Sequence, residues 1–137
     1  MSIRVVRLGT PRAADEGLRL GTVRRPPRGV KKTEFARQNW YDVWVPDLAP
    51  SAQLVSWALA DPWTDARWKR YTRDYLREMK EPHVQRLLAL LAAMSRDTNF
   101  SVGCYCENEA RCHRSLLREL LVNIGAVMNS ESLVASR

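Results

Sequence analysis

The chain has 137 residues, of which 45% are hydrophobic and 27% are charged, as expected for one globular domain with a buried core. It has no apolar run near the roughly 20 residues that span a bilayer and no secretory signal at its N-terminus, so we expect a cytoplasmic protein with no membrane partner. Residues 1–40 carry ten basic and three acidic side chains, which accounts for the whole net charge of +7; this asymmetry indicates either an anionic partner (nucleic acid or an anionic small molecule) or a solvated basic face.

Three short strands are predicted in the first third of the chain, over residues 3–8, 18–23 and 40–46, where β-branched and aromatic residues concentrate. Between the second and the third, Pro26 and Pro27 lack backbone N–H groups, so this stretch cannot be regular structure. We call residues 24–29 the arginine arm. It carries Arg24, Arg25 and Arg28 and ends at the permissive Gly29.

Helical spacing of apolar residues predicts four helices in the rest of the chain. Ser51 and Thr64 are suited to cap the first two, which run to about residues 60 and 80, and Pro82 suits the first turn of the third, which runs to residue 94. Residues 100–106 then predict a buried strand, and the last helix ends near Gly125.

This order of elements predicts an α/β fold: a small, mainly parallel sheet flanked by helices on both faces. We expect a single domain over residues 1–125, with residues 126–137 as a C-terminal tail that frays. In such folds ligands bind at the carboxyl ends of the strands, and the loop at 107–111 is expected at that edge. The oligomeric state is not indicated.

All three cysteines lie where the last predicted strand ends and the last predicted helix begins. Cys104 and Cys106 end the strand, and Cys112 comes directly before His113 and Arg114. A helix N-terminus attracts anions and lowers the pKa of a thiol, so a site is predicted here.

One interpretation is an enzyme or binding site for an anionic, phosphate-bearing ligand, such as a nucleotide. His113 is then the acid/base, with Cys112 or Cys106 as a nucleophile. The predicted cleft is lined by the arginine arm, the turn at 47–51 and the loop at 106–114. Its ligand-binding residues are Arg24, Arg25, Arg28, Gly29, Ser51 and Arg114.

Three alternatives remain open at this point. No cofactor is predicted, but if a metal is present, zinc or iron would be held by Cys104, Cys106, Cys112 and His113. Cys106 and Cys112 could instead form a reversible disulfide. The cysteines could also be no more than small buried hydrophobes, with His113 at the start of the helix. A nucleic-acid-binding module that uses the basic N-terminal third is the further alternative to an enzyme.

Several segments, taken together in order, resemble the DUF488 family of uncharacterised bacterial proteins, including its YeaO-like branch. They are Arg7–Pro11, Glu16–Arg19, the arm with its following lysines (24–32), Asp47–Ser51 and Cys112–Arg114. Arg24 stands where that branch usually has an aspartate, and Pro26 where it usually has a tryptophan. The resemblance implies a small α/β fold. It also favours a site built from His113 and the arginines over the metal and disulfide interpretations.

Overall fold

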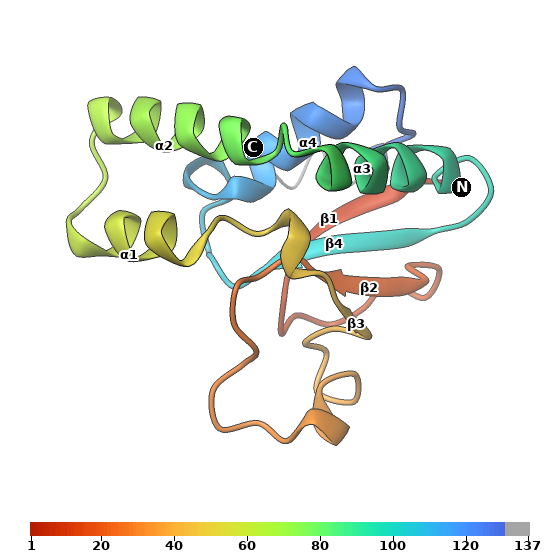
Figure 1. The fold of residues 1–137 in the computed structure, drawn as a ribbon. Helices are drawn as coiled ribbons and strands as arrows, with labels where there is room; N and C mark the ends of the chain where they lie inside the picture. The colour runs from red at the N-terminus through yellow and green to blue at the C-terminus, as the bar shows by residue number, and fades with distance from the viewer. Residues whose placement is uncertain (131–137) are drawn as a thin grey trace.

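The computed structural model describes residues 1–130 and contains a four-stranded sheet in which all strands are parallel (Figure 1). The strand order is β1-β4-β2-β3. The strands are β1 (Ile3–Arg7), β2 (Leu18–Gly21), β3 (Val43–Trp44) and β4 (Phe100–Cys104). The helices are α1 (Ala52–Ala60), α2 (Asp65–Glu78), α3 (Pro82–Met94) and α4 (His113–Asn123), with short 3-10 turns η1 (Lys32–Glu34), η2 (Pro46–Leu48) and η3 (Glu109–Arg111). The predicted α/β class with a small parallel sheet is confirmed.

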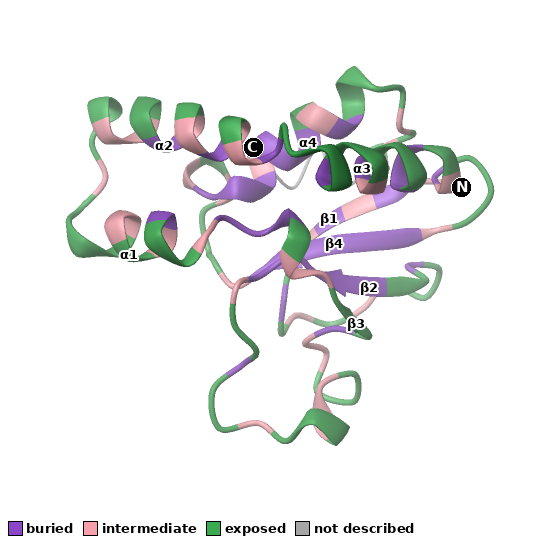
Figure 2. Ribbon diagram, in the orientation of Figure 1, coloured by how far each residue is buried: buried purple, intermediate pink, exposed green. Residues whose placement is uncertain are grey.

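Strand β4 is the centre of the sheet, since β1 and β2 pair with it on either side and all five of its residues are buried (Figure 2). Arg7 of β1 is opposite Cys104, and Gly21 of β2 is opposite Gly103. The three strands therefore end at the same level. This shared carboxyl edge is where a parallel sheet binds ligands.

The predicted helix boundaries follow local capping rules. Ser51 and Thr64 each accept a hydrogen bond from the backbone N–H three residues on, at 3.2 and 3.1 Å. Pro82 is in the first turn of α3. Gly125 has a φ of +87° and follows α4, and the next N–H returns to the carbonyl of Leu121, which is a Schellman ending.

Within residues 1–130 all the α-helices pack on one face of the sheet, so the expectation of helices on both faces is wrong for this part of the chain. Buried residues of all four α-helices belong to the same core cluster as Ile3, Val5, Phe100 and Val102, which alternate on one face of the sheet. Irregular chain covers the other face of the sheet. This chain packs closely against the strands because they carry glycines, which have no side chain, at the points of contact. A Cβ on Gly21 would lie 2.3 Å from the ring of Tyr41, and one on Gly103 would lie 2.6 Å from Leu8.

Two further details differ from the sequence-based expectation. The third strand is only two residues long: it lies at the edge of the sheet, and Pro46 begins η2 after a single intervening residue, Val45. At the end of the chain, the backbone of residues 127–129 hydrogen-bonds to Ile3 beside β1, while the rest of the expected tail, residues 131–137, lies outside the described residues. Among the described residues, no helix has the length and apolar character needed to cross a bilayer.

Candidate functional site

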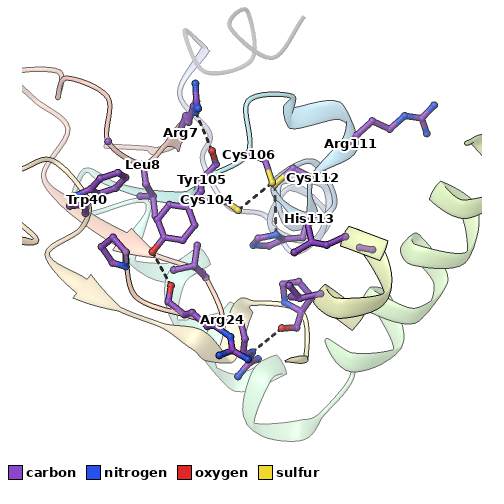
Figure 3. Close-up of a pocket in the computed structure, with 18 of the residues that line it drawn as sticks. Arg7, Leu8, Arg24, Trp40, Cys104, Tyr105, Cys106, Arg111, Cys112 and His113 are labelled. Carbon is purple, nitrogen blue, oxygen red and sulfur yellow. Dashed lines mark hydrogen bonds between the residues drawn. The ribbon is translucent and has the colours of Figure 1, made fainter. Parts of the chain in front are cut away.

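A pocket of about 1030 Å³ lies at the carboxyl edge of the sheet. It is lined by the chain that follows β1, by the arginine arm, by α1 and by the start of α4 (Figure 3). Five arginines contribute to its wall, and none of the described residues that line it is acidic. These arginines are Arg7, Arg24, Arg25, Arg28 and Arg111. The pocket wall is therefore basic, although Arg7 and Arg111 are ion-paired with Glu107 and Asp65 outside it.

Aromatic and apolar side chains make up much of the remaining wall. Trp40 and Tyr105 stand edge to face, with ring centroids 5.9 Å apart, and Trp63 packs against Tyr71 at 5.2 Å. A cationic pocket with aromatic walls suits a ligand that combines a flat ring with an anionic group.

The five arginines differ in whether their guanidinium groups already form hydrogen bonds or ion pairs within the protein. Arg24 donates to the carbonyls of three residues in the turn after β3, Pro46, Ala49 and Pro50, at 2.9–3.3 Å. Arg7 donates to the carbonyl of Tyr105, and Arg111 pairs with Asp65 at 2.9 Å.

Arg25 and Arg28 are the two arginines of the pocket whose charges stay available. Both side chains are exposed, and no described residue hydrogen-bonds to or pairs with either guanidinium. The arm is held in place by its backbone instead, because the hydroxyl of Tyr105 donates to the carbonyl of Arg25 at 2.8 Å. The arm thus presents two free cations from a fixed backbone.

The three thiols of the chain meet at the base of the pocket. The sulfurs of Cys104, Cys106 and Cys112 all lie within 4.8 Å of one another, and Cys104 and Cys106 are 3.8 Å apart. Cys104 ends β4 and Cys112 is the N-cap residue of α4, so the central strand and the last helix bring them together. We call these three residues the thiol cluster. A cluster of this geometry could hold a metal ion.

His113 adjoins the thiol cluster in a defined orientation. Its Nε2 is 2.6 Å from the carbonyl oxygen of Thr22, and its Nδ1 is 3.7 Å from the sulfur of Cys112. A carbonyl oxygen only accepts, so Nε2 carries a proton. In the neutral ring Nδ1 then has a free lone pair directed at Cys112.

The three thiols of the cluster differ in their pKa values. Hydrogen bonds from the thiols of Cys104 and Cys106, with the nearby His113, hold the pKa of Cys112 well below its usual range, although burial opposes this. Hydrogen bonding to the other two thiols, and burial, raise the pKa of Cys104. For Cys106 the bond with Cys104 lowers the pKa, but the interaction with Cys112 and burial outweigh it and raise the pKa to about 11. The cluster therefore favours one thiolate, at Cys112.

Two buried arginines of α4 fix the loop that carries Cys106. Arg114 is 3% exposed, and its Nη2 donates to the carbonyl of Cys106. Arg118 holds Glu109 through two hydrogen bonds, at 2.7 and 3.3 Å. Arg114 thus faces the underside of the loop, and it is absent from the pocket wall.

The structure brings together most of the residues that the sequence singled out. The pocket wall includes Arg24, Arg25, Arg28, Cys106, Cys112 and His113. Gly29, Ser51 and Arg114 are not among its lining residues. Ser51 is occupied as a helix cap, and its hydroxyl donates to Glu78 at 2.5 Å.

Sequence reasoning missed Arg7, Arg111 and the wall formed by α1. Arg7 is the last residue of β1, so its place at a strand's carboxyl end was a signal that could have found it. Val55, Ala58 and Leu59 of α1 also line the pocket, and their apolar side chains gave no such signal.

Together the fold and the pocket define a class of protein: an α/β domain with a parallel sheet, whose carboxyl edge carries a cationic pocket ending on clustered thiols. A family model described as the active DUF488-N3 subclade (DUF488-N3a) matches residues 3–125. The chain therefore belongs to the DUF488 family, as its motifs indicated. No curated protein and no solved structure matches it significantly.

Proposed function

We propose that this protein binds a small phosphate-bearing molecule of nucleotide type in the pocket and presents it to the Cys112–His113 pair. The observation that supports this most directly is the lining itself, with five arginines and no described acidic residue. A volume of about 1030 Å³ also suits a ligand of that size, since small-molecule pockets range up to about 1,000 Å³. All three cysteines are free thiols, which favours a reducing compartment such as the cytoplasm for this activity.

In this proposal Arg25 and Arg28 bind the phosphate. A guanidinium holds a phosphate through paired hydrogen bonds, and these two are exposed with no partner among the described residues. Arg24 serves the site indirectly, because its bonds to the turn after β3 shape the arm. Trp40 and Tyr105 line the pocket, and in this proposal the ring of the ligand stacks on one of them.

His113 and Cys112 form the reactive end of the proposed site. Both are buried, at 3% and 2% exposed, so only a molecule seated in the pocket reaches them. The free lone pair of Nδ1 accepts the proton of Cys112. His113 is thus the acid/base partner of the thiol, and Cys106 is the neighbouring second thiol.

Calorimetric titration of the reduced protein with inorganic pyrophosphate and with AMP tests the binding step. We expect Arg25→Ala and Arg28→Ala each to weaken binding roughly tenfold, in line with the loss of a charge-assisted hydrogen bond. Arg37→Ala is the matched control, since Arg37 belongs to the same basic third, is 81% exposed and pairs with Glu34 away from the pocket. Equal loss in all three variants, or no binding at all, would exclude the pocket as a phosphate site.

The second candidate is a nucleic-acid-binding module. It is favoured by the exposure of Arg25, Arg28, Lys31 and Lys32 within eight residues of the protruding segment below the sheet (Figure 1). A module would bind duplex DNA regardless of sequence and lose it between low and moderate salt. Under this alternative Arg37→Ala would weaken binding as much as Arg25→Ala does, and pyrophosphate would compete poorly.

A further inference from the structure

The thiol cluster has the geometry of a metal centre that the proposed ligand site does not itself require. In a tetrahedral zinc–thiolate site each Zn–S bond is about 2.3 Å, so neighbouring sulfurs lie about 3.8 Å apart. The sulfurs of Cys104 and Cys106 are 3.8 Å apart, and all three sulfurs lie within 4.8 Å of one another. Small side-chain rotations would place all three around one ion.

Two positive groups lie beside the thiol cluster, the N-terminus of α4 at Cys112 and the guanidinium of Arg114 at Cys106. Cys112 stands at the N-terminus of α4, where the helix dipole is positive. The guanidinium of Arg114 is held against the Cys106 carbonyl, and its buried Nε has no hydrogen-bond partner among the described residues. An ion with three thiolates carries a net charge of −1, and this arginine lies beside it.

The donor set also selects the metal. Three soft sulfur ligands suit zinc rather than magnesium or calcium. His113 Nδ1 is close to Cys112 but does not join the group of mutually close sulfurs. Three protein ligands and one remaining position is the arrangement of zinc sites that bind a further molecule.

We propose that Cys104, Cys106 and Cys112 bind one Zn²⁺ ion as thiolates, with the fourth position open to the pocket. The thiol protons pass to solvent on binding, and the oxidation state of zinc and sulfur does not change. This inference rests on the proposed phosphate site but replaces its reactive thiol, because in the zinc-bound protein Cys112 is bound to the ion and the ion faces the phosphate. Zinc binding and alkylation of the cluster then exclude each other.

The test uses the full chain, reduced, stripped with a chelator and incubated with Zn²⁺ alone. We expect about one zinc per chain after gel filtration, with X-ray absorption showing three sulfurs near 2.3 Å and one lighter ligand. We also expect zinc to protect the thiols from iodoacetamide. A folded, reduced chain that retains no zinc, or a sulfur count other than three, would overturn the assignment.

Cys106→Ser is the critical variant because Cys106 is exposed and its loss should leave the fold intact, which circular dichroism checks. We expect it to weaken zinc binding at least tenfold, as judged by competition with a chelator. His83→Ala is the control, since His83 is a surface residue near Asp47. Unchanged zinc affinity in Cys106→Ser would refute the site.

The metal site and the phosphate site can fail separately. Arg25→Ala should keep its zinc while binding pyrophosphate more weakly, and the stripped wild-type chain should still bind pyrophosphate. If zinc is absent but Arg25→Ala binds pyrophosphate more weakly, the metal site falls and the phosphate pocket stands. If zinc binds but pyrophosphate does not, the phosphate pocket falls and the metal site stands.

Discussion

Removing the charge of Glu16 should destabilise the protein strongly, because Glu16 forms a buried ion pair with Arg19. The two side chains are 2% and 0% exposed, and they share two hydrogen bonds of 2.8 and 3.0 Å. The hydroxyl of Ser101 on β4 donates to the same carboxylate at 2.7 Å. The guanidinium also donates to the carbonyls of Thr10 and Asn39. The pair therefore ties the irregular chain to the face of the sheet opposite the core that α1 to α4 cover.

Glu16→Gln preserves the shape of the side chain but removes the carboxylate charge that is bonded directly to the buried Arg19 guanidinium. Removing one partner of a buried ion pair costs about 3–5 kcal/mol. For a chain of this length, about 1 kcal/mol corresponds to a change of roughly 3–5 °C in Tm, so the expected loss is about 9–25 °C. Asp15→Asn is the matched control, since Asp15 is 69% exposed and pairs with Arg4 at the surface. It should cost at most about 1 kcal/mol.

Urea unfolding followed by circular dichroism measures both variants, and its pH dependence gives a second readout. Burial raises the pKa of Glu16, but the hydrogen bonds from Arg19 and Ser101 outweigh it and lower the pKa below its usual value. A carboxyl whose folded pKa is depressed stabilises the fold above its unfolded pKa, near 4.3. That contribution is lost as the pH falls through the folded pKa. The difference in unfolding free energy between wild type and Glu16→Gln should therefore have its full value at pH 7 and shrink below about pH 4. A Glu16→Gln loss no larger than that of Asp15→Asn, or a gap that widens in acid, would refute this account.

The remaining predictions concern the backbone around the site. Gly17 and Gly29 have φ values of +76° and +71°, but a Cβ on Gly17 would lie 1.9 Å from the carbonyl oxygen of Asn99 whereas one on Gly29 would meet nothing. Gly29→Ala should thus cost only the left-handed strain of about 1–2 kcal/mol, and Gly17→Ala about 1–3 kcal/mol more; equal urea midpoints would contradict this. Arg24→Ala should cost about 1.5–3 kcal/mol through its lost carbonyl partners, and an unchanged midpoint would show that the turn after β3 stands without it.

Most of the motif residues that identify the family stabilise the fold. The Glu16–Arg19 segment holds the buried ion pair and a glycine that admits no side chain. Ser51, in the motif after β3, caps α1 and bonds to Glu78. Arg114 of the Cys-His-Arg motif supports the loop at Cys106. Recognising these motifs from the sequence therefore predicted the fold better than it predicted which side chains reach the pocket.

The sequence by itself determined the helices, their caps and the α/β class, because these depend on residues within four positions of each other. Ser51, Thr64, Pro82 and Gly125 act where local rules place them. It also showed that thiols, an imidazole and arginines gather near one strand end.

Only the tertiary structure decided which of these groups are free to act. Arg24 and Arg25 are adjacent in the sequence and equal in charge. Arg24 is occupied by carbonyls 22 to 26 residues away, while Arg25 remains open to the pocket. The convergence of the three sulfurs likewise required β4 to end beside the first turn of α4. Such partners are set by long-range packing, for which the local spacing of residues carries no signal.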